Sequence, residues 1–129
     1  MVIDSSALVA ILFGEAEAFE LAKAIAGDPV RVVSAATLLE TSMVVEARHR
    51  EAGGRELDLL LLRAKIGVIP VDHDQVEIAQ GAWRRFGKGH HPAGLNYGDC
   101  FSYALAIRRG EPLLFKGDDF TRTDVRPAA

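Results

Sequence analysis

Short apolar runs alternate along the chain with longer segments in which apolar residues recur at helical spacing. Four of these runs are too short for helices and are rich in β-branched residues or leucine, so they predict strands. The strands are expected at residues 2–3, 30–33, 67–71 and 113–115. Because helical segments separate them, the pattern predicts an α/β fold. We expect a parallel central sheet of about four to five short strands, flanked by helices on both faces.

The predicted helices are separated by glycines and opened by polar capping residues. Ser34 is placed to cap a long helix that runs to about Arg50, and Asp72 with Gln75 forms a capping-box pattern. Two adjacent glycines, at 53–54, separate the long helix from the next one. The expected helices cover residues 7–13, 15–26, 35–50, 56–65, 73–86 and 97–109, and residues 87–94 form a loop.

Length and composition suit one compact domain. The chain has 129 residues, of which 49% are hydrophobic and 26% charged, and these values exclude a disordered or collagen-like chain. We expect a single domain over residues 1–129, with a polar tail after about residue 121. The single cysteine excludes an internal disulfide framework and indicates a reducing compartment. No cationic stretch precedes the first apolar run, and no run reaches the roughly 20 residues of a membrane span, so we expect a cytoplasmic protein without signal peptide or membrane segment.

Basic residues gather ahead of Asp99. The formal net charge of −3 argues against a protein that coats nucleic acid as a whole. However, no acidic residue lies between Glu77 and Asp99, and this stretch carries Arg84, Arg85 and Lys88. We interpret this stretch either as a basic patch that lies directly ahead of Asp99 or as a solvated helix end followed by a loop.

Acidic residues follow the first and the last predicted strands. Asp4 comes directly after the first strand, and Asp118 and Asp119 come shortly after the last. Because ligands bind beyond the carboxyl ends of parallel strands, these acids reach one edge if the two strands are neighbours. Each position also has a structural interpretation, since Asp4 can cap the next helix and residues 117–119 can form a turn.

Two further acids lie on predicted helices. Glu40 shares a helical face with Met43 and Val44, the face expected to pack on the sheet. An ionised carboxylate is costly to bury there unless a cation or several donors meet it. Asp99 opens the last helix three residues after Asn96, which fits a capping box as well as a catalytic acid.

Taken together, these acids can converge on one cleft. Clustered carboxylates repel one another, and without a cation some of them would take up protons near neutral pH. A hard divalent cation removes that penalty, and magnesium binds carboxylates while it keeps several of its waters. An all-oxygen cluster therefore favours Mg²⁺ or Mn²⁺ over zinc, which prefers His and Cys.

Several segments of the chain together resemble a PIN domain, and more narrowly the VapC-type toxins of bacterial type II toxin–antitoxin systems. The resemblance rests on residues 2–8 (VIDSSAL), Glu40, residues 96–100 (NYGDC) and residues 114–124 (LFKGDDFTRTD). It covers nearly the whole chain. It implies a Mg²⁺-dependent endoribonuclease that a VapB-type antitoxin neutralises, with Mn²⁺ as an alternative ion.

The resemblance also implies roles for individual residues. Asp4, Glu40 and Asp99 would hold the metal ion or its waters. The fourth acid would be Asp119, which fits the ending typical of the family, although its neighbour Asp118 stays open. Two polar residues match positions beside these acids, the hydroxyl residue Ser6 and the amide Asn96.

The expected reaction is metal-assisted hydrolysis of an RNA phosphodiester. Arg84, Arg85 and Lys88 would hold the RNA backbone, and single-stranded loops are the expected target. Two alternatives share an acid after the first strand, a haloacid-dehalogenase-type phosphatase and a phospho-receiver domain. The phosphatase needs a second acid where this chain has Ser6, and the receiver needs a central phospho-acceptor that is not evident.

The chain has apolar side chains that one small domain cannot all bury in its core. Leu38 and Val45 point away from the predicted sheet-facing side of their helix, and residues 59–62 are four consecutive leucines. We therefore expect a homodimer or a docked antitoxin helix on this surface.

Overall fold

A four-stranded parallel sheet forms the centre of the molecule in the computed structural model, which describes residues 1–129. The sheet has the order β3-β2-β1-β4, and β1 therefore lies between β2 and β4. Val2 of β1 is opposite Val32 on one side and Leu113 on the other. The strands are β1 (Val2–Ile3), β2 (Val32–Ser34), β3 (Gly67–Ile69) and β4 (Leu113–Leu114).

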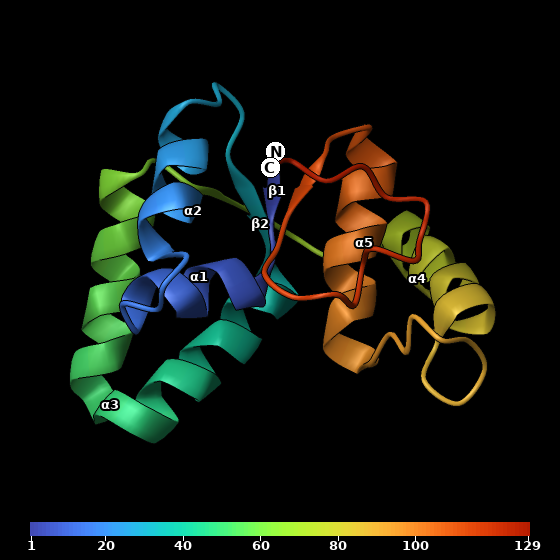
Figure 1. Ribbon diagram of the computed structural model, residues 1–129, viewed down its shortest axis with the longest axis horizontal. Coiled ribbons are helices and arrows are strands. Elements are labelled where there is room, and N and C mark those ends of the chain that lie inside the picture. Colours follow the sequence, from blue (N-terminus) through green and yellow to red (C-terminus); the bar gives the residue numbers. More distant parts are fainter.

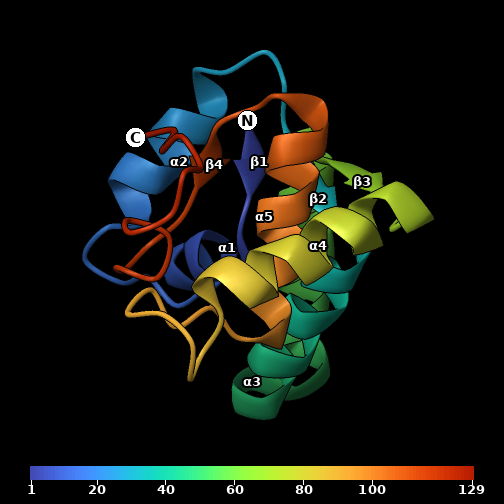
Figure 2. The same cartoon turned by 90° about the vertical axis from the view of Figure 1, so that its right-hand side faces the viewer.

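Helices cover both faces of this sheet, which confirms the predicted α/β architecture (Figure 1). In Figure 1, α1, α2 and α3 lie to the left of the strands, and α4 and α5 lie to the right. Figure 2, turned so that this right-hand side faces the viewer, has α4 and α5 in front of the sheet. The helices are α1 (Ser5–Leu12), α2 (Ala18–Ala26), α3 (Ala35–Arg63), α4 (His73–Phe86) and α5 (Tyr97–Arg109).

Alternate residues of the strands belong to two separate hydrophobic clusters. Val2, Val32 and Leu113 belong to the cluster shared with α4 and α5. The next residue on each of these strands belongs instead to the cluster shared with α1 and α2. Side chains of a strand point alternately to opposite faces, so even two-residue strands anchor both layers.

Helix α3 consists of two limbs joined at a kink. The kink lies at Arg50, whose backbone has φ 55° and ψ −147°. The prediction of two helical segments is thus confirmed, but the break does not lie at the two glycines. Gly53 instead permits close packing of the limbs, since a Cβ there would lie 2.6 Å from the carbonyl oxygen of Val45. The guanidinium of Arg48 lies over the Phe13 ring, 4.2 Å from its centroid, just before the kink.

The sheet-facing side of α3 differs from the prediction. Thr37, Thr41 and Val45 are the buried residues of its first limb, whereas Met43 and Val44 are 65% and 41% exposed. The threonines tolerate burial because their hydroxyls are satisfied: Thr41 donates to the carbonyl of Thr37 at 2.8 Å, within the helix itself. Val45, predicted to point away from the sheet, is fully buried.

The segment after Thr121, expected as a polar tail, packs against the domain. Val125 is 6% exposed and belongs to the cluster beneath α4 and α5. The backbone N–H of Leu113 donates to Arg126 at 2.8 Å, so the segment covers the outer edge of β4. Tyr103 donates its hydroxyl to Asp124 at 2.5 Å, and burial together with this hydrogen bond raises the pKa of Tyr103 to about 12.

None of the helices combines the length and the hydropathy that a membrane span requires.

Candidate active site

Asp4 lies at the carboxyl end of the central strand β1 and is 3% exposed. It caps helix α1, and Ser6 donates to its Oδ2 through both the backbone N–H (3.0 Å) and the hydroxyl (2.7 Å). Ser102 on α5 donates to the other oxygen, Oδ1, at 2.6 Å. The structural interpretation of Asp4 as a cap is therefore correct, yet both of its oxygens also point into a network that links α1 to α5.

Asp99 opens α5 within a complete capping box. Its backbone N–H donates to Asn96 Oδ1 at 2.9 Å, and the N–H of Asn96 donates to Asp99 Oδ2 at 3.0 Å. Burial is the largest cause of a rise in the pKa of Asp99 to about 7, and the negative charges of Asp4, Asp119 and Glu40 raise it further. The hydrogen bond from Asn96 opposes this rise. The carboxylate is thus held in a field that disfavours its own charge.

Glu40 reaches the same place from the first limb of α3. Burial and the charge of Asp4 raise the pKa of Glu40, and a hydrogen bond to the Ser5 side chain opposes them. Its carboxylate lies against Gly98, where an added Cβ would be 2.0 Å from Glu40 Oε2. A side chain at this position would force the carboxylate to move away from the N-terminus of α5, where the helix dipole favours negative charge.

The loop after β4 supplies the fourth acid. The charge of Asp119 acts on Asp99, whereas Asp118 is not among the groups that shift the pKa of Asp99. The buried ring of Phe120, which is 2% exposed, anchors the loop next to Asp119. Of the two adjacent acids, Asp119 is thus the one whose charge acts on Asp99.

Sequence reasoning missed three supporting residues. Ser102 lies three residues after Asp99, on the same helical face, and this spacing was the available signal for it. Gly98 belongs to the segment 96–100 that carries the resemblance, but no local pattern indicates its contact with Glu40, which is distant in sequence. Lys116 donates its backbone N–H to Ser6 at 3.0 Å and pairs through Nζ with Glu15 and Glu17, so it ties the β4 loop to the end of α1.

The chemistry of this carboxylate cluster fits a hard divalent cation. All four acids offer oxygen, and no lysine or arginine is among the groups that shift the pKa of Glu40 or Asp99. No three His, Cys, Asp or Glu side chains are close enough to form a preassembled metal site. The support for a divalent cation therefore comes from the donor set, which is all carboxylate oxygen as Mg²⁺ prefers.

The three basic residues ahead of Asp99 are not equivalent in their surroundings. Arg84 is exposed at the end of α4, and Lys88 is exposed in the loop that leads back to α5. Arg85 is already engaged: it lies 3.5 Å from Asp124 and its guanidinium is 4.6 Å from the centroid of the Phe86 ring. Arg84 and Lys88 are therefore the cations with free charge in this stretch.

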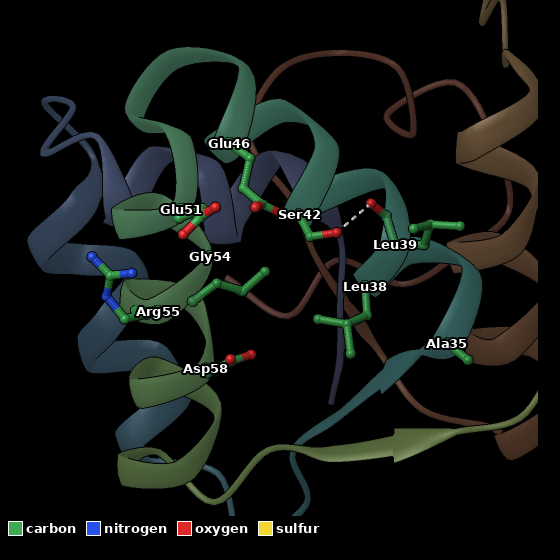
Figure 3. A pocket seen from close by; sticks show the side chains of 10 residues that line it. Ala35, Leu38, Leu39, Ser42, Glu46, Glu51, Gly54, Arg55 and Asp58 are labelled. Carbon is green, nitrogen blue, oxygen red and sulfur yellow. Dashed lines mark hydrogen bonds between the residues drawn. The ribbon is translucent and has the colours of Figure 1, made fainter.

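A hollow of 560 Å³ between the two limbs of α3 contains none of the four acids (Figure 3). Figure 3 shows Glu46 on one limb and Glu51 on the other, with Arg55 and Asp58 further along the second limb. Ser42 donates its hydroxyl back to the carbonyl of Leu39 at 2.8 Å. Arg55 also lines this hollow, which shares no residue with the carboxylate cluster.

Comparisons with known proteins agree with this arrangement. A family model described as the PIN domain matches residues 1–126. The chain is 61% identical over 125 residues to a ribonuclease VapC of Mycolicibacterium smegmatis, covering 97% of each chain. It is 54% identical over 129 residues to ribonuclease VapC30 of Mycobacterium tuberculosis, covering 100% of this chain and 98% of the other.

The fold is also similar to a crystal structure of VapC20 of Mycobacterium tuberculosis, described as a toxin that cleaves the sarcin–ricin loop. The two superpose with a TM-score of 0.76 over 98% of each chain at 21% sequence identity. The phosphatase and phospho-receiver alternatives are set aside, because one family model accounts for the chain from residue 1 to residue 126.

Proposed function

The chain belongs to the PIN-domain family and, within it, to the VapC ribonuclease toxins of toxin–antitoxin systems, and from this premise we propose that its ribonuclease activity depends on Mg²⁺ and is neutralised by a VapB-type antitoxin. One observation carries the proposal. The charges of three carboxylates from separate parts of the chain, Asp4, Glu40 and Asp119, act on the buried carboxyl of Asp99, and burial together with these charges raises the pKa of Asp99 to about 7.

Asp4, Glu40 and Asp99 would hold the ion or its waters, with Asp119 as the fourth acid. When bound, Mg²⁺ or Mn²⁺ neutralises charge on the scissile phosphate and lowers the pKa of a water for attack. Asp4 has little freedom, because Ser6 and Ser102 fix both of its oxygens.

Glu40 is the acid best placed to accept a proton from the attacking water. Asp4 accepts three hydrogen bonds, and Asp99 accepts the N–H of Asn96. Glu40 has fewer donors than Asp4, and burial raises its pKa, which favours proton acceptance. Asn96 acts indirectly, since it fixes the orientation of Asp99.

Arg84 and Lys88 would bind the RNA backbone, with a smaller contribution from Arg85, whose charge is shared with Asp124. Such binding is electrostatic and weakens as salt rises. Replacing Arg84 and Lys88 together by glutamine should raise KM and reduce its salt dependence, whereas kcat should change little. The measurement is cleavage of a single-stranded RNA at several salt concentrations, and an unchanged KM would contradict this role.

Glu40→Gln is the sharpest test of the reaction, with Glu46→Gln as its matched control. Both residues lie on the first limb of α3, but Glu46 lines the hollow between the limbs. We expect Glu40→Gln to lose on the order of 10²-fold or more in kcat on single-stranded RNA with Mg²⁺, and Glu46→Gln to cleave normally. EDTA should abolish cleavage by the wild-type chain. Full activity of Glu40→Gln, or cleavage in EDTA, would refute the proposal.

The same assay distinguishes the two adjacent acids after β4. Asp119→Asn should reduce cleavage, because its charge acts on Asp99, and Asp118→Asn should not. The reverse pattern would assign the fourth position to Asp118.

We expect two protein partners, the proposed antitoxin and a second copy of the chain. We expect the chain to meet them in the cytoplasm. Exposed apolar side chains on α3 offer surface for them, among them Leu39 at 62%, Met43 at 65% and Leu62 at 74%. Light scattering at micromolar concentration should give the mass of a dimer, and a monomer would contradict the second copy. A VapB-type antitoxin encoded beside this chain should co-purify with it and inhibit RNA cleavage. Undiminished cleavage in the purified pair would contradict neutralisation.

A further inference from the structure

Exposed aromatic rings gather at the N-terminus of α5, beside the carboxylate cluster. Tyr97 is 80% exposed and Trp83 is 46% exposed, although both are large apolar rings. Phe101 lies one turn along α5 from Tyr97, and the two rings meet edge to face with centroids 4.9 Å apart. Isolated exposed apolar residues need no explanation, but a group of rings on one surface does.

Two hollows share the rings of Tyr97 and Phe101. One, of 710 Å³, lies between α4 and α5 and is lined by Trp83, Arg84, Tyr97 and Phe101 among others. The other, of 390 Å³, lies between α3 and α5 and is lined by Glu40 as well as by Tyr97 and Phe101. Because both hollows are lined by Tyr97, its ring lies between Arg84 on α4 and Glu40 of the carboxylate cluster, and we call this stretch of surface the path.

We propose that this path is a subsite for an unstacked base of single-stranded RNA, with the ring of Tyr97 as the stacking platform. The proposal rests on the proposed ribonuclease reaction. A phosphate positioned at Glu40 and Asp99 necessarily carries its neighbouring bases within one nucleotide of the cluster, and Tyr97 lines the same hollow as Glu40. Stacking on aromatic rings is how proteins bind single-stranded nucleic acid, because every base has a π face.

Charge also favours a nucleotide over an apolar peptide as the occupant. The far end of the path carries the exposed cation of Arg84, which matches the next phosphate of an RNA strand. The path thus offers a base platform between Arg84, which suits one phosphate, and the carboxylate cluster, where a bound divalent cation would hold the next. A duplex does not fit this arrangement, since its bases are already stacked, so the substrate class is RNA whose bases are splayed out.

The chain has a single tryptophan, and its position in the path provides a readout that needs no cleavage. We would titrate the wild-type chain in EDTA with oligouridylate and with an oligomer of equal length that lacks bases. The base-containing oligomer should quench Trp83 and bind about 5- to 150-fold more tightly, the range expected for stacking of one base. Equal affinities, or no measurable binding of either oligomer, would overturn the proposal.

Tyr97→Ala and Phe19→Ala form a matched pair for the same titration. Phe19 is a similarly exposed ring, 73% exposed, but lies on α2 across the sheet. Tyr97→Ala should remove most of the preference for the base-containing oligomer, and Phe19→Ala should keep it. If Tyr97→Ala weakens binding of the antitoxin but leaves the base preference intact, the path is a protein-docking surface and the proposal fails. A base preference without cleavage under any condition would support the subsite and refute the proposed reaction.

Discussion

Replacing Asp99 by asparagine should stabilise the metal-free protein while it abolishes cleavage. The pKa of Asp99 rises from an ordinary value of 3.8 to about 7, mainly through burial and then through the charges of Asp4, Asp119 and Glu40. Between these two pH values the folded chain binds more protons than the unfolded chain, so stability falls as pH rises. Above pH 7 the folded protein carries an unfavourable charge that Asp99→Asn removes.

The magnitude follows from the size of the shift. Three pKa units correspond to about 4 kcal/mol of destabilisation at high pH, an upper value for the metal-free protein. Because proton binding and folding are linked, the difference in free energy of unfolding between Asp99→Asn and the wild-type chain should grow by about 2.5 kcal/mol from pH 5 to pH 8. The asparagine oxygen can still accept the N–H of Asn96, so the capping box at α5 is kept and the comparison isolates the charge.

The assay is urea unfolding of both proteins in EDTA at pH 5 and pH 8, followed by circular dichroism. Asp118→Asn is the matched control, because it removes an exposed neighbouring charge that does not act on Asp99. Adding Mg²⁺ at pH 8 should stabilise the wild-type chain and have less effect on Asp99→Asn. If wild type and Asp99→Asn lose stability in parallel from pH 5 to pH 8, the reasoning about the charged cluster is wrong.

Further predictions concern residues around the acids. Gly98→Ala should fold but lose most cleavage, because its Cβ would lie 2.0 Å from Glu40 Oε2. Gly81→Ala is the control: it lies in the interior of α4, and no atom lies within 4 Å of the new Cβ. This variant should keep cleavage and gain about 0.5–1 kcal/mol in free energy of unfolding, measured in urea. Ser102→Ala should cost about 1–3 kcal/mol in the same measurement, because it removes the donor at 2.6 Å from Asp4 Oδ1. Normal cleavage by Gly98→Ala, or an undiminished stability of Ser102→Ala, would contradict these assignments.

Local patterns in the sequence were sufficient to predict the sheet and two of its acids. The alternation of strands and helices is a property of neighbouring residues, and it gave the parallel sheet and both of its helical layers. Asp4 and Asp99 could be placed because each follows a clear local signal, the end of a strand and the start of a helix. The same signals explained them as caps, and the structure shows that capping and membership of the cluster coexist in both.

The orientation of α3 could not be predicted in the same way. Apolar residues normally mark the buried face of a helix, but here the first limb buries Thr37 and Thr41 and exposes Met43. Hydrophobic periodicity cannot detect a buried face whose hydroxyls are satisfied by hydrogen bonds. Likewise, Ser102 and Asp4 are 98 positions apart, so their hydrogen bond depends on the packing of α5 against β1, which no local pattern encodes.

The order of the strands has a consequence for newly made chains. The central strand β1 is synthesised first, but its neighbour β4 and the loop with Asp119 lie near the C-terminal end of the sequence. Until that last part has emerged from the ribosome, Asp4 lacks both the α5 hydroxyl that orients it and the companion acid beyond β4. The carboxylate cluster can therefore assemble only after nearly the whole chain has been synthesised.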